Sequence, residues 1–236
     1  MKILYVTSFN KRLYEATGRR MIESFVYYKT EGDLLITYED DLGKDIPKHR
    51  KFIFYNLEED QWLAQWLKEN EDIIPVSLGG LFEGVYEGRA KFNQRASQWF
   101  RKIVALNKAL NYKDKYDAII YLDSDTVFTK HLSSKKIDKK IGRASCREIE
   151  SGIIGFNLQK LGEELLDTVI YKFRSGVFKK YIRWDDGYIF RMVVEENSDI
   201  LTRDLVNCEE SDVVEHGPFA EYIVHDKGVH WKQHGL

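Results

Sequence analysis

The chain has 236 residues, of which 43% are hydrophobic and 14% aromatic, with only 3 prolines, so it can bury a sizeable core and is not intrinsically disordered. Its 36 basic and 38 acidic residues leave a formal net charge of −2, which excludes a general affinity for nucleic acid. The length predicts a single domain over residues 1–236.

Cysteine content and hydropathy bear on the compartment. Two cysteines, Cys146 and Cys208, cannot form a disulfide framework, and no Cys/His spacing typical of structural zinc occurs. The segment 141–148 (IGRASCRE) resembles a translated sequencing-library adapter, so Cys146 is given no functional role. We expect neither a signal peptide nor a membrane span, because no long apolar run occurs. These features together favour the cytoplasm.

The first third of the chain alternates short apolar runs with amphipathic segments. The runs at 2–6, 34–38 and 52–57 predict strands, since each is rich in β-forming residues. Apolar residues at helical spacing predict helices over 14–29 and 59–69. Strands that alternate with helices are typical of an α/β fold with parallel strands.

The middle of the chain contains a glycine-rich stretch and the strongest helical pattern. Glycines 79, 80, 84 and 88 predict an ordered but irregular loop near a site. Residues 94–111 predict a long helix with one apolar face, formed by Trp99, Ile103, Leu106 and Leu110. A further apolar run at 118–122 predicts a strand.

Two acidic residues follow that last strand. Asp123 and Asp125 stand two positions apart, so in an extended chain they lie on one face, about 6–7 Å apart. Carboxylates at the end of a buried strand repel each other and are costly to desolvate without a cation. Such oxygen ligands suit Mg²⁺ or Mn²⁺, especially alongside substrate phosphates. The alternative is a solvated loop with two ordinary acids.

Here the sequence resembles the GT-A glycosyltransferases, whose DxD motif follows such a strand and holds a divalent metal against the diphosphate of a nucleotide-sugar. Three further segments match in the same order: the helix with Lys102, then 150–157 (ESGIIGFN), then 225–232 (HDKGVHWK). The last segment resembles the ending of the glycogenin-like retaining transferases (family 8). Its lysine follows His230 and Trp231 here, whereas the family usually places its lysine before Pro-Trp.

The resemblance implies a Rossmann-like three-layer α/β sandwich with a mixed central sheet. Residues 1–125 would then form the nucleotide-sugar-binding half, and 126–236 the acceptor half with the metal-binding C-terminus. The implied ligands of Mn²⁺ or Mg²⁺ are Asp123, Asp125 and His225, and Lys232 or Lys227 would meet the diphosphate. Candidate donor-binding residues are Thr7, Ser8, Phe9, Arg12 (or Arg19), Glu39, Asp40, Lys102, Ser124, Gly228 and Lys232.

Asp185 and Asp186 are the candidate catalytic residues on the sugar or acceptor side. An inverting enzyme needs a carboxylate base for the acceptor hydroxyl. The family has Asp-Gln where this chain has Asp185-Asp186. The alternative is a pair of acids that begins a helix, where the positive end of the dipole stabilises them.

The predicted activity is transfer of a sugar from a nucleoside diphosphate, with UDP as the expected nucleotide, to a hydroxyl of a glycan, protein or small molecule. A metal and a lysine would stabilise the departing diphosphate. Two alternatives remain. The strand before Asp123 also resembles that of haloacid dehalogenase-type phosphohydrolases, in which Asp123 would be the nucleophile and Asp125 the acid/base. A catalytically silent nucleotide-sugar-binding module on the same fold is the other.

Overall fold

The computed structural model describes residues 1–71, 95–140, 144–145, 152–197 and 219–225. The strands of its main sheet are β1 (Ile3–Phe9), β2 (Asp33–Tyr38), β3 (Phe52–Asn56), β4 (Ala118–Leu122), β6 (Ala144–Ser145) and β7 (Ile153–Asn157). Within these residues the six strands follow the order β3-β2-β1-β4-β7-β6. The strands from β3 to β4 run parallel, and β7 runs antiparallel to both of its neighbours, so the sheet is mixed.

Both faces of the central strands are buried, which explains their continuous apolar runs. Because the pleat turns successive side chains to opposite faces, β1 sends Leu4 and Val6 into one core and Ile3 and Tyr5 into the other. All five residues of β4 are buried. The strand that ends at the acidic pair therefore lies inside the molecule.

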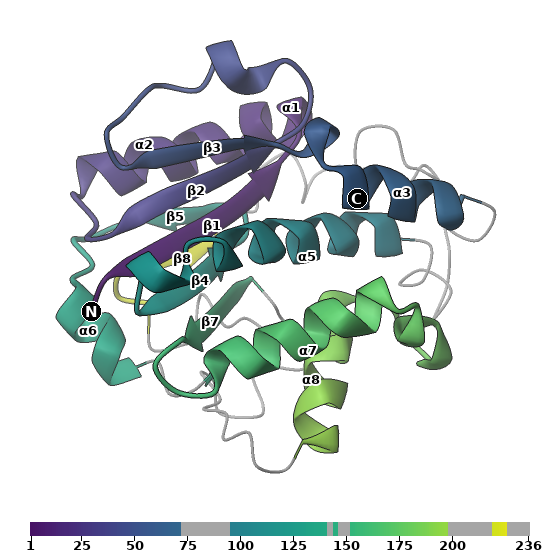
Figure 1. The fold of residues 1–236 in the computed structure, drawn as a ribbon. Coiled ribbons are helices and arrows are strands. Elements are labelled where there is room, and N and C mark those ends of the chain that lie inside the picture. The colour runs from purple at the N-terminus through teal and green to yellow at the C-terminus, as the bar shows by residue number, and fades with distance from the viewer. Residues whose placement is uncertain (72–94, 141–143, 146–151, 198–218, 226–236) are drawn as a thin grey trace.

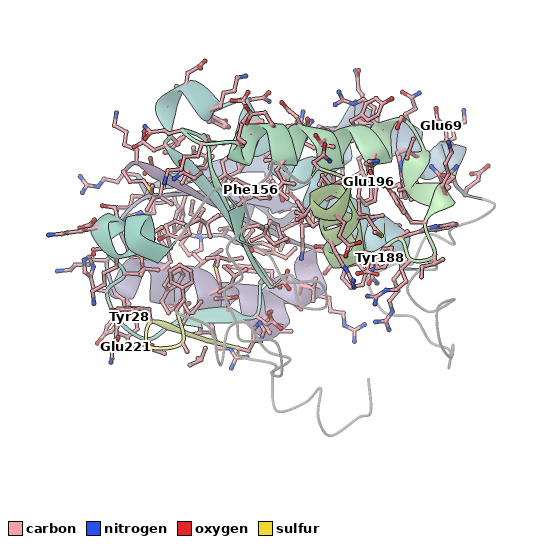
Figure 2. The ribbon with its side chains drawn as sticks, turned by 90° about the horizontal axis from the view of Figure 1, so that it is seen from below. Tyr28, Glu69, Phe156, Tyr188, Glu196 and Glu221 are labelled. Atoms are coloured by element: carbon pink, nitrogen blue, oxygen red, sulfur yellow. The ribbon has the colours of Figure 1, made fainter. Side chains whose placement is uncertain are left out.

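One face of the sheet is covered by the helices α3 (Gln61–Glu69), α5 (Ala96–Leu110), α7 (Gly162–Arg174) and α8 (Asp186–Glu196), as Figure 1 shows. Trp66 of α3 stacks on Phe100 of α5 with ring centroids 4.0 Å apart. In the view of Figure 2, the buried Phe156 of β7 lies near the middle of the molecule, and Tyr188 and Glu196 of α8 lie to its right. The ring of Phe190 on α8 lies 5.6 Å from that of Phe156, so α8 packs on the same face of the sheet.

The opposite face is covered by α2 (Arg19–Tyr27), α6 (Ser134–Lys140) and a two-stranded ribbon of β5 (Thr126–Phe128) and β8 (Ile223–His225). The ring of Phe25 meets those of Tyr5 and Phe128 edge-on, each at 5.5 Å. Tyr28, just after α2, and Glu221, just before β8, lie on this side of the molecule (Figure 2). Two layers of helices and ribbon thus enclose the sheet.

The segment 14–29, predicted as one helix, has a more irregular start. A short α1 (Lys11–Leu13) leads into a π-helical turn over Tyr14–Gly18, and only then does α2 begin. A Cβ on Gly18 would lie 3.1 Å from the ring of Phe9, so this residue allows the turn to pack closely on the end of β1. Single π turns inside helices often occur at functional sites.

Most predicted elements are confirmed within one or two residues of their ends. The run at 52–57 ends one residue early as a strand, because Asn56 accepts a hydrogen bond from the Glu58 amide and starts a 3₁₀ turn. Within the described residues, three more 3₁₀ turns span Leu42–Lys44, Lys113–Lys115 and Val177–Lys180. The glycine-rich stretch 79–88 lies outside the described residues. In the described part of the chain, no helix is long and apolar enough to cross a membrane.

Candidate active site

The predicted acidic motif lies where the strand order of the sheet reverses. The chain leaves β1 toward β2 on one side, while β4 pairs with β1 on the other. In open α/β sheets, ligands bind in the crevice at the carboxyl ends of strands at such a point. A tight turn holds the motif there, because Asp123 donates its amide to the Gly152 carbonyl at 2.9 Å and accepts from the Thr126 amide at 3.0 Å.

Lys102 of α5 connects the motif to the start of α8. Its Nζ lies 3.1 Å from Oδ1 of Asp123 and 2.8 Å from Oδ2 of Asp186. The same ammonium lies 4.7 Å from the ring centroid of Tyr121, in cation–π range. Only 5% of Lys102 is exposed. The ammonium is therefore a buried bridge between the end of β4 and the start of α8.

The side chain of Lys102 keeps its positive charge although it is buried. Burial by itself would lower the pKa of Lys102, but the carboxylates of Asp123 and Asp186 outweigh it, and the pKa is raised above its usual value. Burial also raises the pKa of the Tyr121 hydroxyl. Lys102 is thus an ammonium, and Tyr121 a neutral phenol, across the physiological pH range.

The two predicted catalytic acids have different surroundings. Asp185 is the N-cap of α8: its Oδ1 accepts from the Tyr188 amide at 3.0 Å, and its Oδ2 accepts from Nε of Arg183 at 2.8 Å. Asp186 begins the helix proper, and its carboxylate reaches Lys102. Both residues are buried, at 5% and 1% exposure. Of the two acids, Asp186 is the one that contacts Lys102, and Lys102 in turn contacts Asp123.

We expect Asp185→Ala to lower the free energy of unfolding by about 1–2 kcal/mol, since it removes a helix cap. Asp185→Asn should lose less, because an amide oxygen still caps the Tyr188 amide. Urea unfolding followed by circular dichroism measures both variants. Equal stability of the alanine variant and the unchanged protein would contradict this role.

The proposed metal ligands are partly gathered. Thr126 pairs with His225 across the β5–β8 ribbon, and this brings Nε2 of His225 to 4.0 Å from Oδ1 of Asp125. Two ligands bound to one cation at about 2.1 Å can be separated by up to about 4.2 Å, so this spacing suits a shared metal. Two carboxylates and an imidazole form a donor set that fits Mn²⁺ or Mg²⁺. The side chains of Asp123 and Asp125 are 36% and 32% exposed, although Oδ1 of Asp125, the oxygen that faces His225, is itself buried.

Asp123, the third predicted ligand, is not arranged to share that metal. Oδ1 of Asp123 faces Lys102. Among the residues that the structure describes, no three His, Cys, Asp or Glu side chains are grouped closely enough to hold a metal ion. Metal binding at all three predicted ligands therefore stays a prediction.

The predicted donor-binding residues at the end of β1 differ in accessibility. Thr7 and Phe9 are buried on the α2 side, whereas Ser8 is half-buried and Arg12, in α1, is exposed. Ser124 is buried, and its Oγ lies 3.4 Å from Oγ1 of Thr17 in the π-helical turn. The structure thus brings the segment after β1 against the acidic motif.

Glu39 and Asp40, the two acids that follow β2, each accept a hydrogen bond. Glu39 accepts a hydrogen bond from Nε of Arg101 at 2.7 Å, so α5 contacts this strand end as well as Asp123. Asp40 has a positive φ of 61° and accepts from the Lys11 amide at 2.8 Å. Aspartate adopts this left-handed conformation more readily than most residues. Together these contacts hold the segment after β2 against α5 and α1.

Sequence reasoning missed three residues near the acidic motif. Thr17 contacts Ser124, Arg101 contacts Glu39, and the ring of Tyr121 faces Lys102. A signal for Lys102 was present, because it lies three residues after Trp99 and four before Leu106, inside the apolar face of its helix. A lysine in such a stripe is buried and needs a carboxylate partner. Gly228, Lys232 and Lys227 lie outside the described residues, so their predicted contacts with the diphosphate stay predictions.

Comparisons with known proteins bear on the fold. No protein-family model matches the chain, and a search of curated proteins found no match. Among solved structures, the chain is similar to the apo form of mouse xyloside xylosyltransferase 1, with a TM-score of 0.50 and 13% sequence identity. The likeness covers 89% of each chain. It confirms the predicted fold class: the chain has an α/β GT-A fold with a mixed central sheet.

Proposed function

We propose that the protein is a metal-dependent glycosyltransferase that moves a sugar from a nucleoside-diphosphate sugar to a hydroxyl acceptor. One observation supports this most: on a GT-A fold, Asp123 and Asp125 leave β4 at the reversal of strand order, with His225 4.0 Å from Asp125. Crevices at this position bind ligands, and this donor set suits a divalent cation beside a diphosphate.

In the proposed reaction the bond between the anomeric carbon and the diphosphate oxygen breaks. A bond to the acceptor oxygen forms, and the proton of the acceptor hydroxyl passes to a carboxylate base or to the departing diphosphate. Asp123, Asp125 and His225 would hold Mn²⁺ or Mg²⁺, which would stabilise the charge that develops on the diphosphate. Of the two acids predicted on the sugar or acceptor side, Asp186 contacts this cluster and Asp185 caps a helix.

The two halves of the chain would divide these tasks. Residues 1–125 contain the ends of β1, β2 and β4, which we propose as the donor side, and 126–236 contain α8 and β8 on the acceptor side. UDP is the proposed nucleotide. The structural neighbour is by its name a xylosyltransferase acting on a xyloside, so a pentose belongs among the donors tested beside hexoses. A cytoplasmic location stays a prediction.

The phosphohydrolase alternative gains no support from the fold. In that family the nucleophile lies on the first strand, whereas Asp123 follows β4, and the fold likeness is to a transferase. A silent binding module has the same fold, so only an activity measurement separates it from an enzyme.

The test is a thermal-shift panel of UDP, GDP, CMP and their sugar conjugates, each with Mn²⁺ or with EDTA. A ligand at 100 times its Kd stabilises the folded state by about 2.7 kcal/mol, which raises Tm by about 5–10 °C for a chain of this size. We expect that shift for one nucleotide family, only with Mn²⁺, together with slow hydrolysis of the matching sugar donor.

Other results would redirect the assignment. A Mn²⁺-dependent shift without donor hydrolysis or transfer would support the binding module. No shift with any nucleotide, combined with Mg²⁺-dependent release of phosphate from p-nitrophenyl phosphate, would support the phosphohydrolase.

A further inference from the structure

One buried ammonium serves two carboxylates that belong to different parts of the proposed site. Lys102 lies 3.1 Å from Asp123, a proposed metal ligand, and 2.8 Å from Asp186 on α8. Asp186 is 1% exposed, while the side chain of Asp123 is 36% exposed. The buried partner is therefore the fixed one, and the partner that faces solvent is the one a cation can reach.

Lys102 and a divalent cation are both attracted to Asp123. The closer Lys102 is held to Asp186, the less its charge opposes a cation at Asp123 and Asp125. Lys102, Asp123, Asp125 and Asp186 together carry a formal charge of −2, which one divalent cation balances. Such electrostatic coupling is strong in a site that excludes water.

We propose that Asp186 is a positioning residue that sets the metal affinity of Asp123 and Asp125 through Lys102, without touching the metal. The inference rests on the proposed function, because it assumes a cation at these two acids. It assigns to the acceptor-side helix α8 a role in binding the donor's metal. The only contacts it uses are the two ion pairs of Lys102.

The sign of the effect follows from the geometry. Asp186→Asn removes the carboxylate that holds Lys102. The ammonium then pairs with Asp123 alone, where it competes with the cation. Loss of a residue that orients a metal ligand from behind commonly costs 10–100-fold in metal affinity. We therefore expect Asp186→Asn to bind Mn²⁺ 10–100-fold more weakly than the unchanged protein.

The double variant Lys102→Met, Asp186→Asn removes both charges of the ion pair. With no ammonium left to compete at Asp123, its Mn²⁺ affinity should return to within about threefold of the unchanged protein, as expected for strongly coupled neighbours. If Asp186 bound the metal directly, this recovery could not occur.

The chain offers a matched control on the same helix. Lys108 of α5 lies 2.9 Å from the buried Asp60 and 4.5 Å from the ring centroid of Tyr55, so the same three residue types recur about 1.7 turns farther along α5. Asp60→Asn keeps the cap of α3, because asparagine also caps helices well. It should leave Mn²⁺ affinity unchanged.

The measurement is a titration of each full-length variant with Mn²⁺ alone, with unbound Mn²⁺ followed by electron paramagnetic resonance and folding checked by circular dichroism. No Mn²⁺ binding by the unchanged protein would overturn both the metal-dependent function and this inference. Binding by the unchanged protein with equal affinity in Asp186→Asn would overturn the inference alone. Weak binding by Asp186→Asn without recovery in the double variant would also overturn it.

Discussion

Asp125→Ala is expected to lower turnover by about 10³-fold or more while the fold survives. The variant removes one of two ligands spaced for a shared cation, and metal stabilisation of a leaving diphosphate is worth several kcal/mol, with each 1.4 kcal/mol equal to a factor of ten in rate. The side chain is a third exposed, so its loss leaves no cavity in the core. Steady-state kcat with the donor identified in the thermal panel measures the loss.

A matched control lies at the other end of the strands, away from the carboxyl ends that carry the candidate site. Asp33 at the start of β2 is half-buried and accepts a hydrogen bond from the Tyr116 hydroxyl at 2.7 Å. Asp33→Ala should lose about 1 kcal/mol of stability and keep its turnover. Normal turnover by Asp125→Ala, with a melting temperature unchanged, would refute a metal-binding role for this acid.

Much of the fold could be predicted because its signals are local. The strands β1, β2 and β4 are short apolar runs, and a strand buried on both faces needs no other pattern. The amphipathic stripes of α3 and α5 identify helices in the same way. The π-helical turn over Tyr14–Gly18 could not be predicted, since it depends on the packing of Gly18 against the ring of Phe9.

The candidate site also has residues that a local sequence pattern predicts and contacts that only the packing reveals. Asp123 and Asp125 could be predicted because they directly follow an apolar run. The bridge of Lys102 joins elements far apart in the sequence, so only the packing of α5 and α8 reveals it. The sequence alone does not distinguish the roles of the neighbouring residues Asp185 and Asp186. The extended backbone of Asp185, with ψ of 152°, makes it the cap and leaves Asp186 to turn toward Lys102.

Lys102→Met should lower the free energy of unfolding by about 3–5 kcal/mol, because removal of one partner leaves a buried charge without compensation. Asp186 is 1% exposed, and among the described residues its Oδ2 has no hydrogen-bond partner besides the ion pair with Lys102. The pKa of Lys102 is raised, so its contribution is fully present below the unfolded value of about 10.4 and is lost only at higher pH. Urea unfolding at pH 7 measures this loss.

Lys108→Met provides the comparison, since Lys108 lies on the same helix as Lys102 and its ammonium also pairs with a buried aspartate, Asp60. Asp60 keeps two hydrogen bonds, from the Tyr55 hydroxyl at 2.9 Å and the Leu63 amide at 2.8 Å, so this variant should lose less. The double variant Lys102→Met, Asp186→Asn should recover more than half of the lost stability, because it leaves no unpaired charge at Asp186. Equal losses for Lys102→Met and Lys108→Met, with no recovery in the double variant, would show that the stem of Lys102, and not its charge, stabilises the fold.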